Sequence, residues 1–302
     1  MLDSLKLWRD ARGRVSTLRI ATLCLLLTPV GLAVMAAFTE TRFGARPLND
    51  LIHRTGYWAL LFVVMSLAIT PLRRVARFGA LVDVRRMIGV GAFCYAATHI
   101  SLYVADQMFD LAKVATEIAV RLYLTIGFVA LLGLTALAVT STDGMVRRLG
   151  RRWQTLHQAI YVIVLLVLIH FFQQTKADIS VPILVASLVG WLLAYRIMNW
   201  WRNTNAEPSA WALLGLSVAV SVLTFIGEAV GIGIAFHVSP WMVLGMAFDF
   251  DLEVLDIRPG WVVLAAGLCV VVVDIVRSRM RKRTARPAKP APAPVKPMRE
   301  VA

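Results

Sequence analysis

The chain has 302 residues, of which 59% are hydrophobic, and carries a formal net charge of +14 at pH 7. Its mean hydropathy of +0.71 and its repeated apolar stretches of about 20 residues exclude an ordinary soluble enzyme and indicate an integral membrane protein. The positive charge does not indicate nucleic acid binding, because the basic residues lie in short segments between apolar runs and form no soluble face interleaved with aromatics.

Eight apolar stretches are predicted to cross the membrane as helices, which places the chain in the all-α integral membrane class. The first follows a basic segment, as in a signal peptide, but its apolar run is longer than a signal peptide needs, so we retain it as a helix. The second is short and can extend upstream through His53. The predicted ranges are 18–38, 57–71, 87–105, 121–140, 157–173, 181–200, 211–236 and 261–276.

The basic residues divide the predicted loops into two sides. If the N-terminus is inside, most Lys and Arg fall on that side, and the outer loops are acidic. This positive-inside pattern predicts that both termini are cytoplasmic.

The chain is predicted to have four parts. Residues 1–17 form a basic cytoplasmic N-terminus, 18–202 a six-helix transmembrane domain, and 203–280 a two-helix transmembrane extension with an acidic outer loop. Residues 281–302, rich in Pro, Ala and Lys, are expected to be a disordered cytoplasmic tail. This leaves no room for an attached flavin or nicotinamide domain, which would need on the order of a hundred residues.

Three of the five histidines lie at membrane depth, where an imidazole is costly unless something binds it. His99 lies in the third span, and His157 and His170 bracket the fifth. His99 follows Arg86 by thirteen residues, and His170 follows His157 by the same number. If Arg86 and His157 both mark the inner boundary, then at 1.5 Å per residue His99 and His170 reach the same level about 20 Å from it. We predict that His99 and His170 ligate one haem iron from two neighbouring helices.

His157 would serve a second, inner haem, for which no sixth ligand is identified. Thirteen residues correspond to about 220° around an ideal helix, so His157 and His170 would face different sides. A π-bulge or an unwound turn is needed to aim both at one side. The chain has no Cys-x-x-Cys-His motif, so any haem is expected to be of the b type, without thioether links.

Other polar residues at the spans have more ordinary interpretations. His53 and His237 are predicted at the outer interface, and this placement is favoured over a quinone or metal role. Glu228 has no charged neighbour in the sequence and is a candidate for proton or quinone chemistry. The three cysteines fall inside spans and are interpreted as small buried side chains, not as disulfide partners or metal ligands: Cys24, Cys94 and Cys269.

Several strings occur in an order typical of one family. They are His53-x-Thr55-Gly56, Thr70 to Arg74 (TPLRR), Arg85-Arg86-x-Ile88-Gly89 and Leu149 to His157 (LGRRWQTLH). Together with His99 and His170, they make residues 18–202 resemble the MsrQ family. These are the haem-binding membrane subunits of periplasmic methionine-sulfoxide reductase systems, within the wider ferric-reductase-like transmembrane group.

The resemblance implies a ferric-reductase-like six-helix bundle in the bacterial inner membrane, to which this chain adds two helices. It implies haem b, with flavin mononucleotide (FMN) as a second candidate cofactor, and associates His99, His157 and His170 with haem. Electrons would come from the quinone pool or a cytoplasmic flavin reductase. They would pass to a periplasmic molybdopterin-dependent methionine-sulfoxide reductase (MsrP-like), so the chain would be an electron-transfer subunit and not the catalytic one.

Two other functions stay open at this point. A ferric-reductase-like cytochrome could serve another acceptor, and the two added helices leave the identity of the periplasmic partner open. A non-redox transporter or scaffold is the other alternative, and it predicts a colourless protein.

Overall fold

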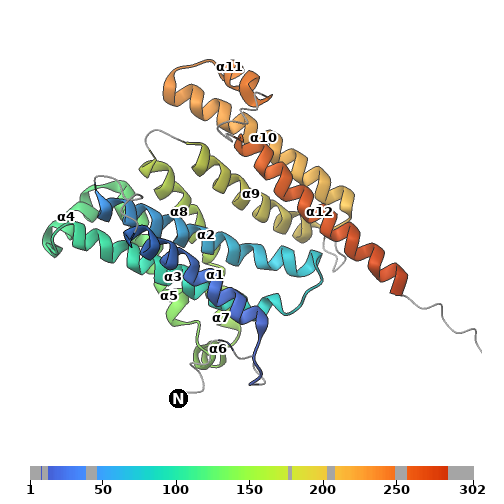
Figure 1. The fold of residues 1–302 in the computed structure, drawn as a ribbon, viewed down its shortest axis with the longest axis horizontal. Helices are drawn as coiled ribbons and strands as arrows, with labels where there is room; N and C mark the ends of the chain where they lie inside the picture. Colours follow the sequence, from blue (N-terminus) through green and yellow to red (C-terminus); the bar gives the residue numbers. More distant parts are fainter. Residues whose placement is uncertain are drawn as a thin grey trace, which may run out of the picture.

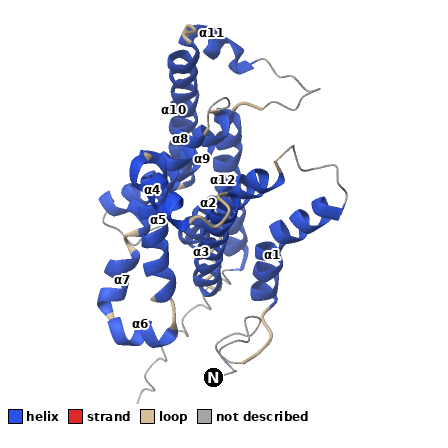
Figure 2. Cartoon of the chain, turned by 90° about the vertical axis from the view of Figure 1, so that its left-hand side faces the viewer, coloured by secondary structure: helices blue, strands red, loops and turns tan. Residues whose placement is uncertain are grey.

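The structure is a computed structural model that describes Trp8 and residues 13–38, 46–175, 179–202, 208–248 and 257–284. All elements in this part of the chain are helices (Figures 1 and 2). They are α1 (Thr17–Phe38), α2 (Pro47–Val75), α3 (Leu81–Asp106), α4 (Leu111–Val120), α5 (Leu122–Val139), α6 (Asp143–Leu149), α7 (Arg151–His157), α8 (Ile160–Gln174), α9 (Ser180–Trp201), α10 (Ala210–Phe236), α11 (Pro240–Gly245), η2 (Met246–Phe248) and α12 (Pro259–Thr284).

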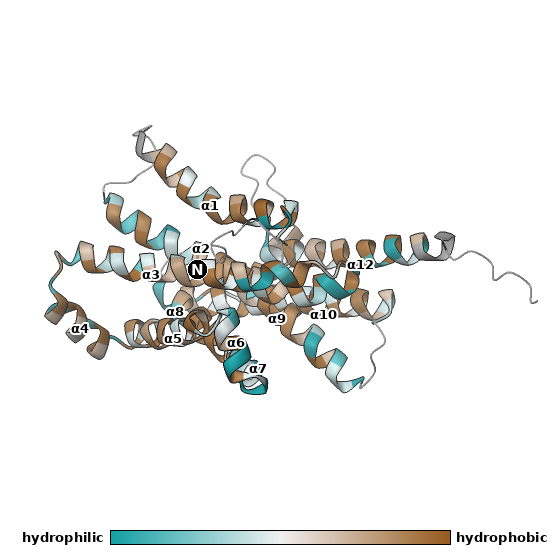
Figure 3. Cartoon of the chain, turned by 90° about the horizontal axis from the view of Figure 1, so that it is seen from below, coloured by the Kyte–Doolittle hydropathy of each residue, from teal (hydrophilic) through white to brown (hydrophobic). Residues whose placement is uncertain are grey.

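Within the described residues, eight helices are long and apolar enough to cross a membrane. This confirms the eight predicted spans and the all-α class: the chain is a multi-pass membrane protein. The second span begins at Pro47, a residue whose fixed φ suits the first turn of a helix, and so includes His53. Figure 3 shows apolar residues along the spans and hydrophilic residues on α6 and α7.

Two helix pairs form the centre of the bundle, α2 with α3 and α5 with α8. The amphipathic α4 joins α3 to α5, and α1 packs against α3. α9 contacts α2 and α8, and also contacts α10 and α12 of the extension (Figure 1). Because lipid is as apolar as the interior, such helices associate through close packing and interhelical hydrogen bonds. The extension therefore lies against α9.

A proline in α2 explains an arginine in α9. Pro71 lies inside α2 and has no N–H, so the carbonyl of Leu67, four residues earlier, loses its helical donor. Arg196 supplies one: its Nη2 donates to the Leu67 oxygen and its Nη1 donates to the Leu192 oxygen at 2.7 Å. The guanidinium also lies 5.8 Å from the ring centroid of Tyr161 on α8. Arg196 thus links α2, α8 and α9.

The predicted burial of the three cysteines is wrong. Cys24, Cys94 and Cys269 are free, and all three are exposed on the outside of the described bundle. A side chain that faces lipid can be as apolar as one that faces the interior, so an apolar run does not indicate which way its residues point.

Glu228 has a charged partner that its neighbours in the sequence do not reveal. It is buried in α10, and its Oε1 lies 3.3 Å from Nη1 of Arg258, just before α12. The hairpin of α10 and α12 brings the two together, although Glu228 has no charged neighbour in the sequence. The predicted acidic loop at 249–256 and the tail beyond Thr284 lie outside the described residues.

Candidate functional site

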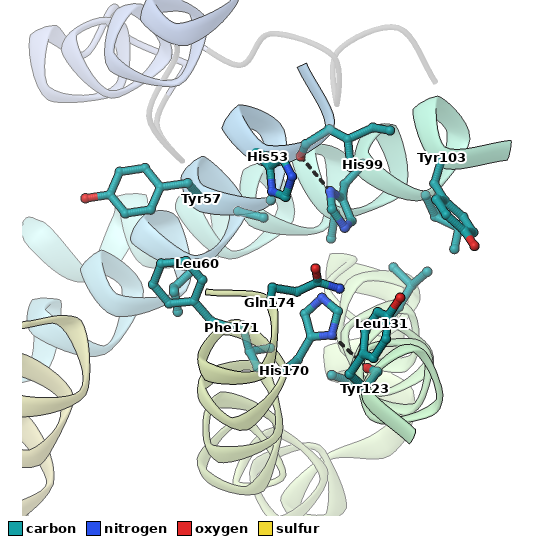
Figure 4. A pocket seen from close by; sticks show the side chains of 18 of the residues that line it. His53, Tyr57, Leu60, His99, Tyr103, Tyr123, Leu131, His170, Phe171 and Gln174 are labelled. Carbon is teal, nitrogen blue, oxygen red and sulfur yellow. Dashed lines mark hydrogen bonds between the residues drawn. The ribbon is translucent and has the colours of Figure 1, made fainter. Parts of the chain in front are cut away.

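His99 on α3 and His170 on α8 face each other across a cavity between the two central helix pairs (Figure 4). Their ring centroids are 6.4 Å apart and their planes meet at 82°. Both residues line a cavity of about 650 Å³. The two histidines that the residue count placed at one level therefore lie together in the fold.

Each imidazole is held by a backbone carbonyl of a neighbouring helix. Nδ1 of His99 lies 2.8 Å from the carbonyl oxygen of Ile52 on α2, and Nδ1 of His170 lies 2.8 Å from that of Tyr123 on α5. A carbonyl can only accept, so Nδ1 carries the proton in both rings and Nε2 keeps its lone pair. This is the tautomer that a metal-binding histidine needs.

The spacing of the rings fits a single metal ion between them. Two metal–nitrogen bonds of about 2 Å in line, plus the radius of each ring, require a centroid separation of ~6 Å. Among the described residues, no three His, Cys, Asp or Glu side chains gather to hold a metal ion. A pair of imidazoles suits a metal whose other ligands come from a macrocycle, as in haem.

The walls of the cavity are apolar and aromatic on the side of α2 and α8. Leu60 and Phe171 line it, and the rings of Tyr57 and Phe171 lie 6.2 Å apart (Figure 4). Such walls suit a flat, mostly apolar ligand and keep water from it. The residues of the cavity thus fit a porphyrin.

Polar residues gather at one edge of the cavity. The exposed His53 lines it beside His99, where sequence reasoning had favoured a plain interfacial position (Figure 4). The hydroxyl of Tyr103 donates to the carboxylate of Glu117 on α4, and Arg121 lies 3.4 Å from the same carboxylate. The bond from Tyr103 on α3 fastens α4 to the edge of the cavity.

His157 does not join the other two histidines. Its Nδ1 lies 3.0 Å from the carbonyl oxygen of Trp153, its ring stacks on that indole at 3.8 Å, and its Nε2 lies 3.4 Å from the hydroxyl of Ser141. The helix is interrupted at Gln158 and Ala159, between α7 and α8. Such a break changes the direction in which His157 points relative to His170. His157 is nevertheless absent from the residues that line the cavity.

Sequence reasoning missed the residues that lie against the ring of His170, namely Tyr123, whose carbonyl holds it, and Gly127 of α5. The signal that could have found them is a repeated string. Gly56 to Leu61 reads GYWALL and Gly127 to Leu132 reads GFVALL, one in each central helix pair.

Known proteins share this sequence pattern. A family model described as the ferric reductase like transmembrane component matches residues 55–168. The chain is 39% identical over 195 residues to the protein-methionine-sulfoxide reductase heme-binding subunit MsrQ of Herminiimonas arsenicoxydans, which covers 63% of this chain and 88% of that protein. The corresponding subunit of Bordetella pertussis is 41% identical over 165 residues, 54% of this chain and 80% of its own length. That of Xanthomonas euvesicatoria pv. vesicatoria is 43% identical, over 54% of this chain and 74% of its own length. No solved structure matches the chain.

The eight-span fold and the matched region define a ferric-reductase-like membrane protein. Because the chain covers most of the relative from Herminiimonas arsenicoxydans at this level of identity, it belongs to the MsrQ family. The alignment covers a smaller share of this chain than of that relative, so this chain is the longer of the two.

Proposed function

We propose that this chain is a membrane electron-transfer subunit that binds a b-type haem between His99 and His170. The observation that carries the proposal is the pair of imidazoles, 6.4 Å apart, each with Nδ1 bound to a carbonyl and Nε2 left for a metal. Membership of a family whose relatives are named heme-binding subunits supports it.

When bound, the haem would supply the one-electron chemistry, and the chain would supply ligation, orientation and shielding. His99 and His170 would hold the haem iron through Nε2. The carbonyls of Ile52 and Tyr123 hold the protons on Nδ1, fix the orientation of the rings and raise the basicity of Nε2. Phe171 and the other apolar wall residues exclude water, which also tunes a redox potential.

The direction of electron flow follows from the proposed topology. We place both termini in the cytoplasm of a bacterium, with the chain in its inner membrane, because the positive-inside pattern of the loops favours it. The site of His99 and His170 then lies in the outer half, and His157 lies on the inner side, where it would serve a second haem. Electrons would enter from the quinone pool or a cytoplasmic flavin reductase, with FMN as a further candidate cofactor.

The proposed acceptor is a periplasmic molybdopterin-dependent methionine-sulfoxide reductase, MsrP-like. The names of the relatives support a methionine-sulfoxide reductase system. An assay with such a reductase tests this step: sulfoxide reduction should depend on the pre-reduced subunit and should cease when the haem is absent.

The test of haem binding is an absorption spectrum of the protein purified from membranes, with the haem type read from its pyridine haemochrome. The wild-type protein should show a sharp α-band on reduction. His99→Ala and His170→Ala should lose the part of it that comes from the haem proposed between them, whereas the control His237→Asn, at the end of α10 outside the cavity, should keep the whole band. Asn suits this control because it tolerates the left-handed conformation that His237 adopts, with φ of 55°.

Three results would contradict the proposal. A wild-type protein without haem after expression with ample iron would leave a non-redox membrane protein. Full retention of low-spin haem in both alanine variants would remove the histidine pair as the ligands. Direct reduction of the pure protein by NADPH, without an added flavoprotein, would favour a self-sufficient reductase instead.

A further inference from the structure

The two halves of the histidine site are built alike. In each half, an imidazole donates to a carbonyl that lies 47 positions earlier in the chain: Ile52 for His99, and Tyr123 for His170. In each half, a glycine follows that carbonyl by one helical turn: Gly56 on α2 and Gly127 on α5. The same arrangement therefore occurs twice, on two separate helix pairs.

Each glycine lies directly against the ring that its helix holds. A Cβ atom at Gly56 would lie 3.0 Å from both Nδ1 and Cε1 of His99. A Cβ atom at Gly127 would lie 2.8 Å from the same two atoms of His170. Ordinary carbon contacts begin at about 3.5 Å, so any side chain at either position would push the imidazole away from the helix.

The chemical reason is access to the carbonyl. In an α-helix, the oxygen of residue i already accepts from the N–H of residue i+4, and the side chain of residue i+4 lies beside that bond. A carbonyl oxygen has a second lone pair, and an imidazole can reach it only where no Cβ intervenes. Gly56 and Gly127 leave that approach open.

We infer that Gly56 and Gly127 are positioning residues for the two haem-ligating histidines. Each lets its helix hold one imidazole as the Nδ1–H tautomer, with Nε2 left for the metal. The inference rests on the proposed function, because it assigns these glycines to the haem site. The glycines touch the ligands and not the reacting iron, so their effect passes through ring orientation and ligand basicity.

The experiment compares Gly127→Ala with Gly133→Ala in the full chain. A Cβ at Gly133 would lie 2.8 Å from Cδ1 and Cγ1 of Ile163, on the same pair of helices, but it would meet the flexible end of an aliphatic chain and no imidazole. Both variants crowd α5 against α8. Only the first displaces a proposed ligand, so a purely structural role predicts equal effects.

For Gly127→Ala, we expect altered electron paramagnetic resonance g-values of the ferric low-spin haem, a larger high-spin fraction and a raised midpoint potential. The potential should rise because a weakened Nδ1–H bond makes the ligand less basic. Loss of haem affinity should be about tenfold or more, the scale typical of partners of metal ligands. Gly56→Ala should show the same changes more weakly, since its contact is longer. Gly133→Ala should keep wild-type g-values.

Unchanged g-values and potential in Gly127→Ala, or equal changes in Gly133→Ala, would overturn the role of the glycines while the proposed haem site stands. A wild-type protein that shows no bis-imidazole signal would instead overturn the proposed function itself. If Gly127→Ala does not accumulate in membranes, Gly56→Ala carries the same comparison, with Gly89→Ala as its control. A Cβ at Gly89 on α3 would make only an ordinary contact, 3.9 Å from Oγ of Ser66 on α2.

Discussion

Arg196→Met is expected to destabilise the bundle chiefly by leaving the carbonyl of Leu67 without a donor. An interhelical hydrogen bond in a membrane protein contributes ~0.6 kcal/mol on average, and a cation–π contact adds about 1 kcal/mol. A buried polar group left unsatisfied costs about 1–3 kcal/mol. The orphaned carbonyl is therefore the largest single effect, and the total loss should be about 3–5 kcal/mol.

The proline separates this explanation from a general loss of packing. Pro71→Ala restores an N–H in α2 that can donate to the Leu67 oxygen. In that background, Arg196→Met should cost less than in the wild type, by about 1–3 kcal/mol. Arg202→Met, on an exposed residue at the end of α9, is the matched control and should cost under about 0.5 kcal/mol.

The assay is unfolding in mixed micelles by titration with a denaturing detergent, followed by helical circular dichroism. The four proteins of the Pro71 and Arg196 cycle give the interaction energy directly. If Arg196→Met costs the same in the wild type and in the Pro71→Ala background, Arg196 does not replace the donor that the proline removes, and the reasoning is wrong.

Three further outcomes are expected. Glu228→Gln should lower the free energy of unfolding by about 1–3 kcal/mol, which is less than the loss of a fully buried ion pair because Arg258 is partly exposed. The variant should leave quinol-dependent haem reduction unchanged, and slower reduction would support a role of Glu228 in proton or quinone chemistry. His157→Ala should leave unchanged the g-values of the haem that we propose between His99 and His170, since its ring lies outside their cavity; loss of that signal would count against two separate sites. Arg86 beside Asp143 lowers the pKa of that carboxyl, so the ion pair stabilises the folded state above the ordinary pKa of about 4 and is lost as the pH falls through the lowered value. Because the pair is exposed, Asp143→Asn should lower the free energy of unfolding by less than about 1 kcal/mol at pH 7. The loss should vanish in acid, where the Asp143 carboxyl of the wild type is also neutral. A loss that grows as the pH falls would contradict this.

The spans could be predicted because bilayer thickness fixes their length, and eight stretches of the required length can be read from hydropathy alone. The meeting of His99 and His170 could also be predicted, because equal residue counts along two helices of the same direction give equal depth. What depth cannot give is the rotation of a helix about its axis. For that reason, Cys24 and Cys94 were predicted inside the bundle and lie on its outside.

Local sequence patterns could not predict contacts between residues that lie far apart in the chain. Glu228 pairs with Arg258 from thirty positions away, and Arg196 serves a carbonyl on a helix far earlier in the chain. Backbone carbonyls carry no residue signature at all, so the hold of Tyr123 on His170 could not be read from residue type. Only the repeated Gly-aromatic-x-Ala-Leu-Leu string, at Gly56 and at Gly127, could have indicated it.

The division of the histidine site into two halves, each on its own helix pair, has a consequence for the order of membrane insertion. His99 on α3 is held by a carbonyl of α2 and His170 on α8 by a carbonyl of α5, and α2 and α3 leave the ribosome before α5 and α8. The hairpin of α2 and α3 can therefore form the contact that holds His99 before α5 and α8 have been synthesised. His170 reaches the cavity only once α8 has been inserted, so the proposed haem site can be complete only late in assembly.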